Sequence, residues 1–432
     1  MWYRQLHWQI LIGLVTGLLF GLVASTMGWT NFTADFIKPI GTIFVSLLKL
    51  IAIPLVIVSL IVGVSGLNDV NKLSRMGGKT IGLYLMTTVI AITIGLVVVN
   101  VIAPGKSLPI ETREELMNSY NDVAKASAES VNAVEQRSLM DFFVDIVPDN
   151  FFSALGDNAS MLQIVFVSIL FGLGIIYLSE ERRTILVNFF DATNHAIINV
   201  VNLIMKIAPY GVFALMANVI VELAGDDLSR AFDLIIALGW YSLTVLIGLS
   251  IHALIVYPTI FRIFKKMKIS HFFKVMRPAL LLGFSTSSSS ATLPVTMERV
   301  ENGLGVDEEV SSFVLPVGAT VNMDGTSLYQ AVAAVFIGQA LGLDLSIVQQ
   351  ITIVLTATLA SIGAAGVPGA GIIMLVIVLQ SIQVPVEGIA LILGVDRILD
   401  MFRTVVNIIG DATVCVSVAA SENLLHPVEE EI

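Results

Sequence analysis

The chain has 432 residues, of which 56% are hydrophobic and only 13% carry a charge. A soluble domain carries a charge on about a quarter of its residues, so this composition excludes an ordinary soluble protein. The net charge of −11 argues against a nucleic-acid-binding protein, which needs a basic face. A single cysteine, Cys415, excludes an internal disulfide.

Several apolar runs are long enough to cross a hydrocarbon core of about 30 Å, which takes about 20 helical residues. The runs are Trp8 to Val23, Ile37 to Val64, Ile81 to Ile102, Met161 to Leu178 and Leu234 to Ile260. The first run starts almost at the N-terminus and lacks a small-residue cleavage site, which predicts a retained span rather than a removable signal peptide.

Basic residues cluster after three of these runs, those that end at Val64, Leu178 and Ile260 and that we count as the second, fourth and sixth spans. They are Lys72, Arg75 and Lys79, then Arg182 and Arg183, then Arg262, Lys265, Lys266, Lys268, Lys274 and Arg277. An excess of Lys and Arg marks cytoplasmic loops. We therefore expect a multi-pass protein of an inner or plasma membrane with both termini in the cytoplasm, and a polar external loop at residues 105–138.

The pattern changes after about residue 278, where the apolar stretches become short and broken. The breaks are Gly283 to Ser290, Gly318 to Thr326 and Ser361 to Gly371. Non-helical backbone survives at membrane depth only inside protein or beside a water-filled cavity, and interrupted apolar segments indicate the binding site of a transporter. The first and third breaks each lie between half-length apolar segments, which predicts two re-entrant helical hairpins.

A row of polar residues near the C-terminus is the strongest single feature. Asp396, Asp400, Arg403, Asn407 and Asp411 are spaced by four, three, four and four residues, so on a helix they share a strip roughly 80° wide. An ionised residue at mid-membrane costs about 2.5–3.5 kcal/mol or more. The row therefore predicts a functional site; the alternative is a buried ion-pair ladder that serves only packing.

The chemistry of this strip favours a small zwitterion with two carboxylates. Arg403 offers a planar fork to a carboxylate, Asp400 offers a carboxylate to an ammonium group, and Asn407 donates and accepts. The complement is aspartate or glutamate. The oxygens of Asp324 and Asp411, with their polar neighbours, suit a hard cation such as Na⁺ rather than a transition metal, and no organic cofactor is expected.

These residues resemble the glutamate transporter family, also called the dicarboxylate/amino acid:cation symporters. The resemblance rests on the serine-rich tip Ser287 to Ser290 followed by Ala-Thr-Leu-Pro294, on Asn322-Met-Asp-Gly-Thr326, on Gly366-Val-Pro-Gly369 and on the polar helix from Asp400 to Asp411. It implies an all-α homotrimer with eight transmembrane helices, two re-entrant hairpins and inverted repeats, in which a transport domain slides as an elevator.

The resemblance also implies a division of the chain. Scaffold helices would occupy 1–70 and 139–222. The transport domain would comprise helix 3 at 71–104, helix 6 at 223–277, hairpin 1 at 278–308, broken helix 7 at 309–343, hairpin 2 at 344–383 and helix 8 at 384–424, with a cytoplasmic tail at 425–432.

The family's binding residues carry over position by position. The implied substrate site comprises Ser288, Ser289, Thr326, Val367, Gly371, Asp400, Arg403, Thr404 and Asn407. The implied first sodium site comprises Gly318, Asn322, Asn407 and Asp411. The second comprises Thr320, Met323, Ser361, Ile362 and Ala364, and the third comprises Tyr84, Thr87, Thr88, Asn322 and Asp324.

The sequence departs from the family pattern at a few positions. Gln330 stands where animal members carry a glutamate tied to proton movement, which favours sodium coupling without protons. Family members often place an arginine at the position of Ser287 or Met401, and this chain has neither, although Arg397 is one turn before Met401. Arg403 favours an acidic substrate, and Asp400 argues against a C4-dicarboxylate, which has no ammonium group.

Several alternative functions stay open. They are a proton-coupled acidic amino acid symporter, a C4-dicarboxylate symporter, an anion channel and an intramembrane serine hydrolase. No Gly-x-Ser-x-Gly motif frames the serines, and His252 and His271 lie outside the broken segments. We therefore expect a transporter rather than an enzyme, and we expect the five histidines to be surface or interface residues.

Overall fold

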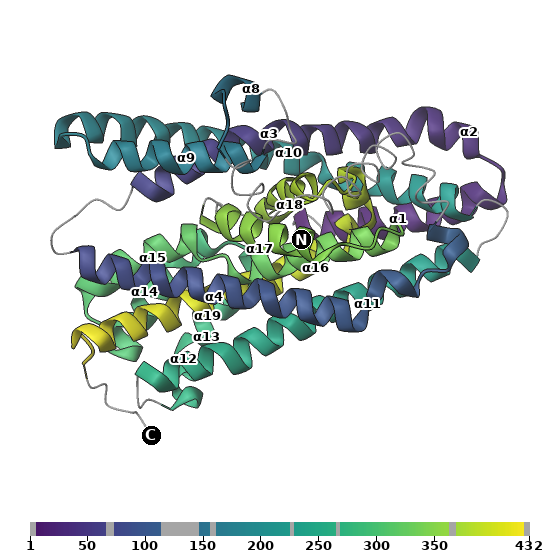
Figure 1. Ribbon diagram of the computed structural model, residues 1–432. Helices are drawn as coiled ribbons and strands as arrows, with labels where there is room; N and C mark the ends of the chain where they lie inside the picture. Colours follow the sequence, from purple (N-terminus) through teal and green to yellow (C-terminus); the bar gives the residue numbers. More distant parts are fainter. Residues whose placement is uncertain are drawn as a thin grey trace.

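The computed structural model describes residues 6–65, 73–113, 147–155, 161–224, 229–264, 268–362 and 369–426. These residues are almost entirely helical (Figure 1). The first half contains α1 (Leu6–Thr26), α2 (Thr30–Phe32), the π-helix η2 (Thr33–Ile37), α3 (Lys38–Ser65), α4 (Leu73–Ile102), the 3₁₀-helix η3 (Pro104–Ser107), α8 (Phe151–Leu155), α9 (Met161–Ile176) and α10 (Glu180–Ala224).

The second half contains shorter helices and one long final helix. They are α11 (Ser229–Ile251), the π-helix η5 (His252–Val256), α12 (Tyr257–Phe264), α13 (Ile269–Thr286), α14 (Ser289–Leu304), α15 (Glu308–Val321), α16 (Asp324–Ala340), α17 (Ile347–Ile362), α18 (Ala370–Ser381), the 3₁₀-helix η6 (Val386–Gly388) and α19 (Ile389–Glu422). The prediction of an all-helical chain is confirmed for the described residues.

Six helical stretches of the described residues are long and apolar enough to cross a membrane. They are Trp8–Thr26, Thr30–Val62, Met76–Ser107, Glu180–Val221, Phe232–Ile263 and Val386–Glu422. The helices α17 and α18 are apolar but shorter. The chain is thus consistent with a multi-pass membrane protein, and the count of eight spans stays a prediction.

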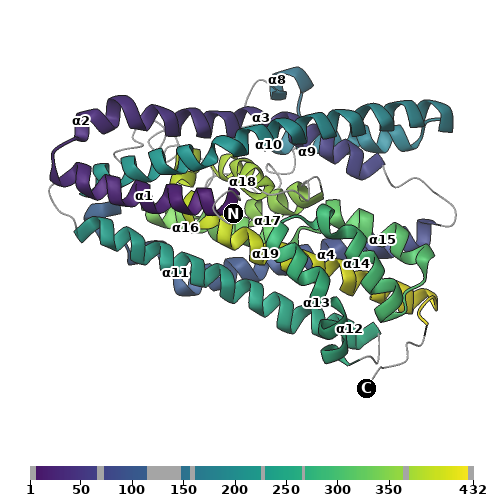
Figure 2. The ribbon, with the colours of Figure 1, turned by 180° about the vertical axis from the view of Figure 1, so that it is seen from behind.

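The helices form two groups. In the first group α10 packs against α1 and α3, and α3 packs against α9; α3, α9 and α10 run together along one side of the molecule in both views (Figures 1 and 2). The second group contains α4 and the helices from α11 onward, with α16 and α19 in contact at its centre.

Glycine spacing explains the close packing of α1 on α10. Gly13, Gly17 and Gly21 are four residues apart and share one face of α1. A Cβ atom at Gly13 would lie 2.3 Å from the carbonyl oxygen of Pro209, and one at Gly17 would lie 2.6 Å from that of Phe213. Small residues at this spacing let membrane helices approach backbone to backbone, so this face can hold only glycine.

The broken segments of the sequence lie in the second group. Helix α15 ends at Val321 and α16 starts at Asp324, with Asn322 and Met323 in non-helical conformations between them. All 17 residues of α16 are buried, as expected for a helix that is enclosed on every side. The break therefore lies inside protein, where non-helical backbone can be satisfied.

The serine run forms the turn between α13 and α14. Ser287 adopts a left-handed conformation with φ of 52°, and Ser288 is extended and accepts a hydrogen bond from the backbone N–H of Ala291 at 3.1 Å. Serine is a preferred residue at the start of a helix because its hydroxyl satisfies such an unpaired donor. The run thus reverses the chain between two helices that pack on each other.

Candidate functional site

Arg403 lies at the centre of a buried charge cluster on α19. Its side chain has no exposed surface, although it is one of the largest side chains in the protein. Nη2 donates to Oδ1 of Asp400 at 2.8 Å, Nη1 lies 3.0 Å from Oδ1 of Asp396, and the guanidinium carbon lies 3.8 Å from the centre of the Tyr329 ring. Such a stack on an aromatic face favours a cation.

The guanidinium still has donors to offer. Nε and Nη1 of Arg403 have no hydrogen-bond partner among the described residues, because Asp396 lies near Nη1 without the alignment of a hydrogen bond. An unpaired guanidinium N–H forms a strong, charge-assisted hydrogen bond with a carboxylate oxygen. Arg403 can therefore accept a bound anion while Asp400 keeps it oriented.

Asp400 is shared between two arginines and a backbone N–H. Its Oδ2 lies 3.3 Å from Nη1 of Arg397 and accepts from the N–H of Gly369 at 3.3 Å, at the start of α18. Asp396, Arg397, Asp400 and Arg403 thus form a buried group with two negative and two positive side chains. A buried charge is stable only when it is paired, and here the four charges balance.

Asn407 joins α19 to the first turn of α16. Its Oδ1 accepts from the backbone N–H of Gly325 at 2.8 Å, and its Nδ2 donates to Oγ1 of Thr326 at 3.3 Å. Helix α18 approaches the same place: a Cβ atom at Gly371 would lie 3.1 Å from Nη1 of Arg403 and 3.2 Å from Cγ2 of Thr326. The structure therefore brings Thr326, Gly371, Arg403 and Asn407 together.

The remaining predicted substrate residues are Thr404, Ser288, Ser289 and Val367. Thr404 is buried and donates to the carbonyl of Asp400 at 2.9 Å. Ser288 and Ser289 are buried at the turn between α13 and α14, and that pair packs on α19. Val367 lies outside the described residues.

The residues predicted for the first sodium site meet where α15, α16 and α19 converge. Nδ2 of Asn322 donates to Oδ1 of Asp411 at 2.8 Å, while Oδ1 of Asn322 is buried without a hydrogen-bond partner among the described residues. A Cβ atom at Gly318 would lie 2.5 Å from both Oδ1 of Asp411 and the Tyr84 hydroxyl. A buried, unpaired oxygen beside a carboxylate fits a hard cation.

The structure brings only some of the residues predicted for the second sodium site close together. Ser361 donates to the carbonyl of Val321 at 2.8 Å and accepts from the N–H of Met323 at 3.3 Å, which joins the end of α17 to the break before α16. Ile362 is the last residue of α17. Thr320 is exposed and bonds to its own helix, and Ala364 lies outside the described residues.

Asp324 carries the third predicted sodium site. Oδ1 accepts a hydrogen bond of 2.5 Å from the hydroxyl of Thr88, which lies on α4. Thr87 is buried beside it but donates to the carbonyl of Tyr84 in its own helix, and the Tyr84 hydroxyl donates to the carbonyl of Val314. The structure thus joins Thr88 to Asp324 directly, whereas Thr87 and Tyr84 bond elsewhere.

The sequence analysis missed two partners of Asp324. His252 is completely buried and places Nε2 3.2 Å from Oδ2 of Asp324, and Tyr257 donates to the same oxygen at 2.7 Å. The expectation that all five histidines are surface or interface residues was therefore wrong for His252. The available signal was a histidine inside an apolar span, which by itself suggests a functional role.

Comparison with known proteins places the chain in one family. The model of the sodium:dicarboxylate symporter family matches residues 6–421. The chain is 39% identical to a proton/sodium-glutamate symport protein of Geobacillus stearothermophilus, over 94% of this chain and 92% of the relative. It is 34% identical to the proton/glutamate-aspartate symporter of Escherichia coli, over 97% and 93%.

A third relative is named for a different substrate. The chain is 33% identical to a C4-dicarboxylate transport protein of Bacillus subtilis, over 98% of this chain and 94% of the relative. The resemblance found in the sequence motifs is thus confirmed over nearly the whole length. The chain belongs to the sodium:dicarboxylate symporter family.

Proposed function

We propose that the chain is a secondary active symporter that takes up L-aspartate or L-glutamate together with Na⁺. The observation that carries the proposal is the buried group of Asp400 and Arg403, which lies beside Thr326, Gly371 and Asn407. Arg403 offers unpaired N–H groups to a substrate carboxylate, and Asp400 offers an oxygen to the ammonium group.

The choice among substrates of the family follows from Asp400. A C4-dicarboxylate would bring only negative charge to a group in which Asp400 is already buried, and an unpaired buried charge is strongly unfavourable. An amino acid brings an ammonium group that can share Asp400 with Arg397. Two of the relatives reported above are named for glutamate or aspartate, which agrees with this choice.

Na⁺ is the proposed coupling ion because the polar residues near the break in α15–α16 offer oxygen ligands. Asn322 Oδ1 is buried and unpaired beside Asp411, and Asp324 and Thr88 form a second oxygen pair. Gln330 is buried and bonds with the carbonyl of Gly371 at 3.4 Å; a neutral amide carries no proton, which favours Na⁺ over a proton at that position.

We further propose that transport proceeds by an elevator movement. The group around α16 and α19 would be the moving domain, and α1, α3, α9 and α10 would form the scaffold of a homotrimer. The binding and coupling residues named above lie in the second group, so one rigid movement could carry substrate and ions together.

The test is uptake of labelled L-aspartate into liposomes that contain the purified protein, with a sodium gradient, a proton gradient or neither. Sodium-driven uptake is expected. Arg403→Lys should reduce uptake at low aspartate concentration by about tenfold or more, because lysine keeps the charge but loses the fork. The matched control Arg182→Lys changes an exposed arginine of α10 and should behave as the wild type. Uptake driven only by protons, or only of succinate, would overturn the proposed ion or substrate.

A further inference from the structure

Both carboxylate oxygens of Asp324 are held by side chains of other helices. Oδ1 accepts from Thr88 of α4, and Oδ2 accepts from Tyr257 and lies 3.2 Å from Nε2 of His252. All four side chains are buried, with at most 1% of their surface exposed. The two oxygens are therefore distinguished: one faces α4, and the other faces the start of α12.

A π-helical segment explains how His252 and Tyr257 reach the same oxygen. In an α-helix, residues five apart point about 140° away from each other. Here the backbone N–H of Tyr257 bonds to the carbonyl of His252 across the wider turn of η5, so the two residues lie one above the other. Their rings meet edge to face, with centroids 4.5 Å apart. Such single π-turns occur frequently at functional sites.

Helix α19 leaves room for the Tyr257 hydroxyl. A Cβ atom at Gly410 would lie 2.4 Å from that hydroxyl and 2.6 Å from Nδ2 of Asn322. The phenol oxygen thus sits between Asp324 and the backbone of α19. It lies near Asn322, whose Nδ2 donates to Asp411. Any larger side chain at position 410 would displace it.

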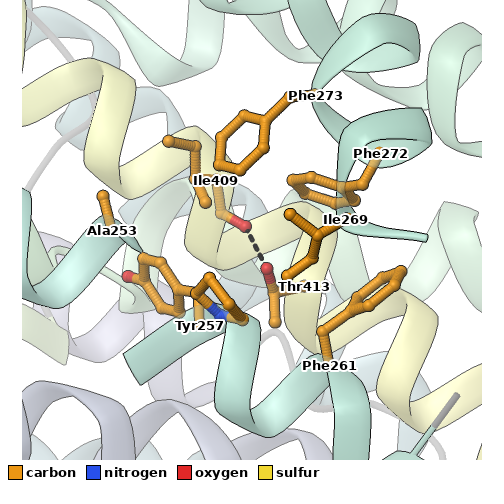
Figure 3. A pocket seen from close by; sticks show the side chains of 9 residues that line it. Ala253, Tyr257, Phe261, Ile269, Phe272, Phe273, Ile409 and Thr413 are labelled. Atoms are coloured by element: carbon orange, nitrogen blue, oxygen red, sulfur yellow. Dashed lines mark hydrogen bonds between the residues drawn. The ribbon is translucent and has the colours of Figure 1, made fainter. Parts of the chain in front are cut away.

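The Tyr257 ring borders a pocket on its other side. A small apolar pocket lies there, lined by Tyr257, Phe261, Phe272, Phe273, Ile409 and Thr413 among others. Figure 3 shows the ring at the edge of this pocket with its hydroxyl pointing away from it. The hydroxyl therefore points toward Asp324, on the side away from the pocket.

We propose that Tyr257 and His252 are positioning residues for sodium coupling. They occupy Oδ2 of Asp324 and turn Oδ1 toward Thr88, so that an ion between α16 and α4 meets one oriented carboxylate oxygen. This inference rests on the proposed sodium-coupled function. Neither residue need touch the ion; each acts through Asp324.

The test is the Na⁺ concentration for half-maximal effect, measured both in aspartate uptake and in thermal stabilisation of the purified protein by NaCl, with choline chloride as the salt control. Tyr257→Phe keeps the ring and removes one hydrogen bond to a charged group, so the half-maximal concentration should rise about tenfold. His252→Leu should have a similar effect, and His252→Gln, which retains an N–H donor, a smaller one.

Thr413→Val is the matched control, because it removes a hydroxyl from the same pocket that bonds to the carbonyl of Ile409 in its own helix. It should leave the Na⁺ dependence unchanged. The aspartate KM at saturating Na⁺ should be the same in all variants. A loss of fold can be recognised separately, because it would lower maximal uptake without shifting the Na⁺ curve.

The outcomes separate the two proposals. A wild type that responds equally to Na⁺ and choline would overturn sodium coupling and this inference with it. A wild type that responds to Na⁺, with a Tyr257→Phe curve that superimposes on it, would overturn the positioning role alone.

Discussion

At position 318 only a hydrogen atom fits between α15 and α19. The Asp411 carboxylate and the Tyr84 hydroxyl both approach this glycine to within 2.5 Å of where a Cβ atom would lie. Glycine has no need here of a special backbone conformation, since it lies within α15. Its role is to let three helices converge on the oxygens of Asn322 and Asp411.

Gly318→Ala should therefore displace Asp411 or Tyr84, because real Cβ atoms do not approach other atoms this closely. The displacement should raise the Na⁺ concentration for half-maximal uptake by about tenfold or more. The Na⁺ dependence of aspartate uptake measures it. Gly82→Ala is the control: no atom lies within 4 Å of a Cβ there, so its curve should match the wild type. If the Na⁺ dependence of Gly318→Ala matched that of the wild type, the close approach of Asp411 and Tyr84 to Gly318 would have no role in Na⁺ binding, and the prediction would be wrong.

At the scale of elements, the end of α19 is tied back to the connection between α14 and α15. Val306 and Leu425 form an isolated antiparallel bridge, and the N–H of His426 donates to the carbonyl of Gly305 at 2.7 Å. Nε2 of His426 lies 3.2 Å from Oδ2 of Asp307. The backbone N–H of Glu309, followed by His426, lowers the pKa of the Asp307 carboxyl, because both favour its charged form.

This lowered pKa predicts a pH dependence. A carboxyl whose pKa is lower in the folded state stabilises the fold above its unfolded pKa of about 3.9, and the contribution is lost as the pH falls through the folded pKa. Asp307→Asn should therefore lower Tm slightly, by about one or two degrees, at pH 6, and the difference from the wild type should shrink as the pH falls below about 3.9.

Thermal unfolding in detergent across this pH range measures the difference. Asp149→Asn, at an exposed position, should leave Tm unchanged at both ends. A difference between Asp307→Asn and the wild type that grows as the pH falls would contradict the assignment.

At the scale of the whole molecule, the two groups of helices meet where α1 crosses α19. A Cβ atom at Gly394 would lie 3.0 Å from Cγ of Leu14. The missing side chain at Gly394 thus makes room on α19 for Leu14 of α1. Near the start of α18, Gly369 faces Met205 of α10 in a similar way, with the sulfur 3.0 Å from an ideal Cβ. Contacts of this kind permit one group to move past the other only when they are released.

The double variant Leu14→Cys/Gly394→Cys tests this movement. A sulfur at the Cγ position of residue 14 would lie at disulfide range from a Cβ atom at residue 394, so oxidation should join α1 to α19. If α19 moves past α1 during transport, oxidised protein should lose most of its uptake, and dithiothreitol should restore it. The native Cys415 is buried, and each single variant serves as the control. Full uptake by the cross-linked protein would contradict an elevator movement at this contact.

The sequence by itself predicted those features that neighbouring residues encode. Composition predicted a membrane protein, and spacing along one helix placed Asp396, Asp400, Arg403, Asn407 and Asp411 on one strip, which α19 forms as a single helix. Glycine, serine and asparagine runs predicted the interruptions at Ser287 and at Asn322. Periodicity and turn chemistry act over a few residues, so they can be recognised without knowing how the helices pack.

Only the tertiary structure showed which distant side chains meet. The pairing of Arg403 with Asp396 and its stacking on Tyr329 depend on how α19 is rotated against α16. The contacts of His252 and Tyr257 with Asp324 join residues 72 and 67 positions apart, through a π-turn with no clear sequence signature. Thr320 bonds to its own helix although the family pattern gives it to an ion site. Packing between helices decides such contacts, because it sums many weak interactions that no local pattern records.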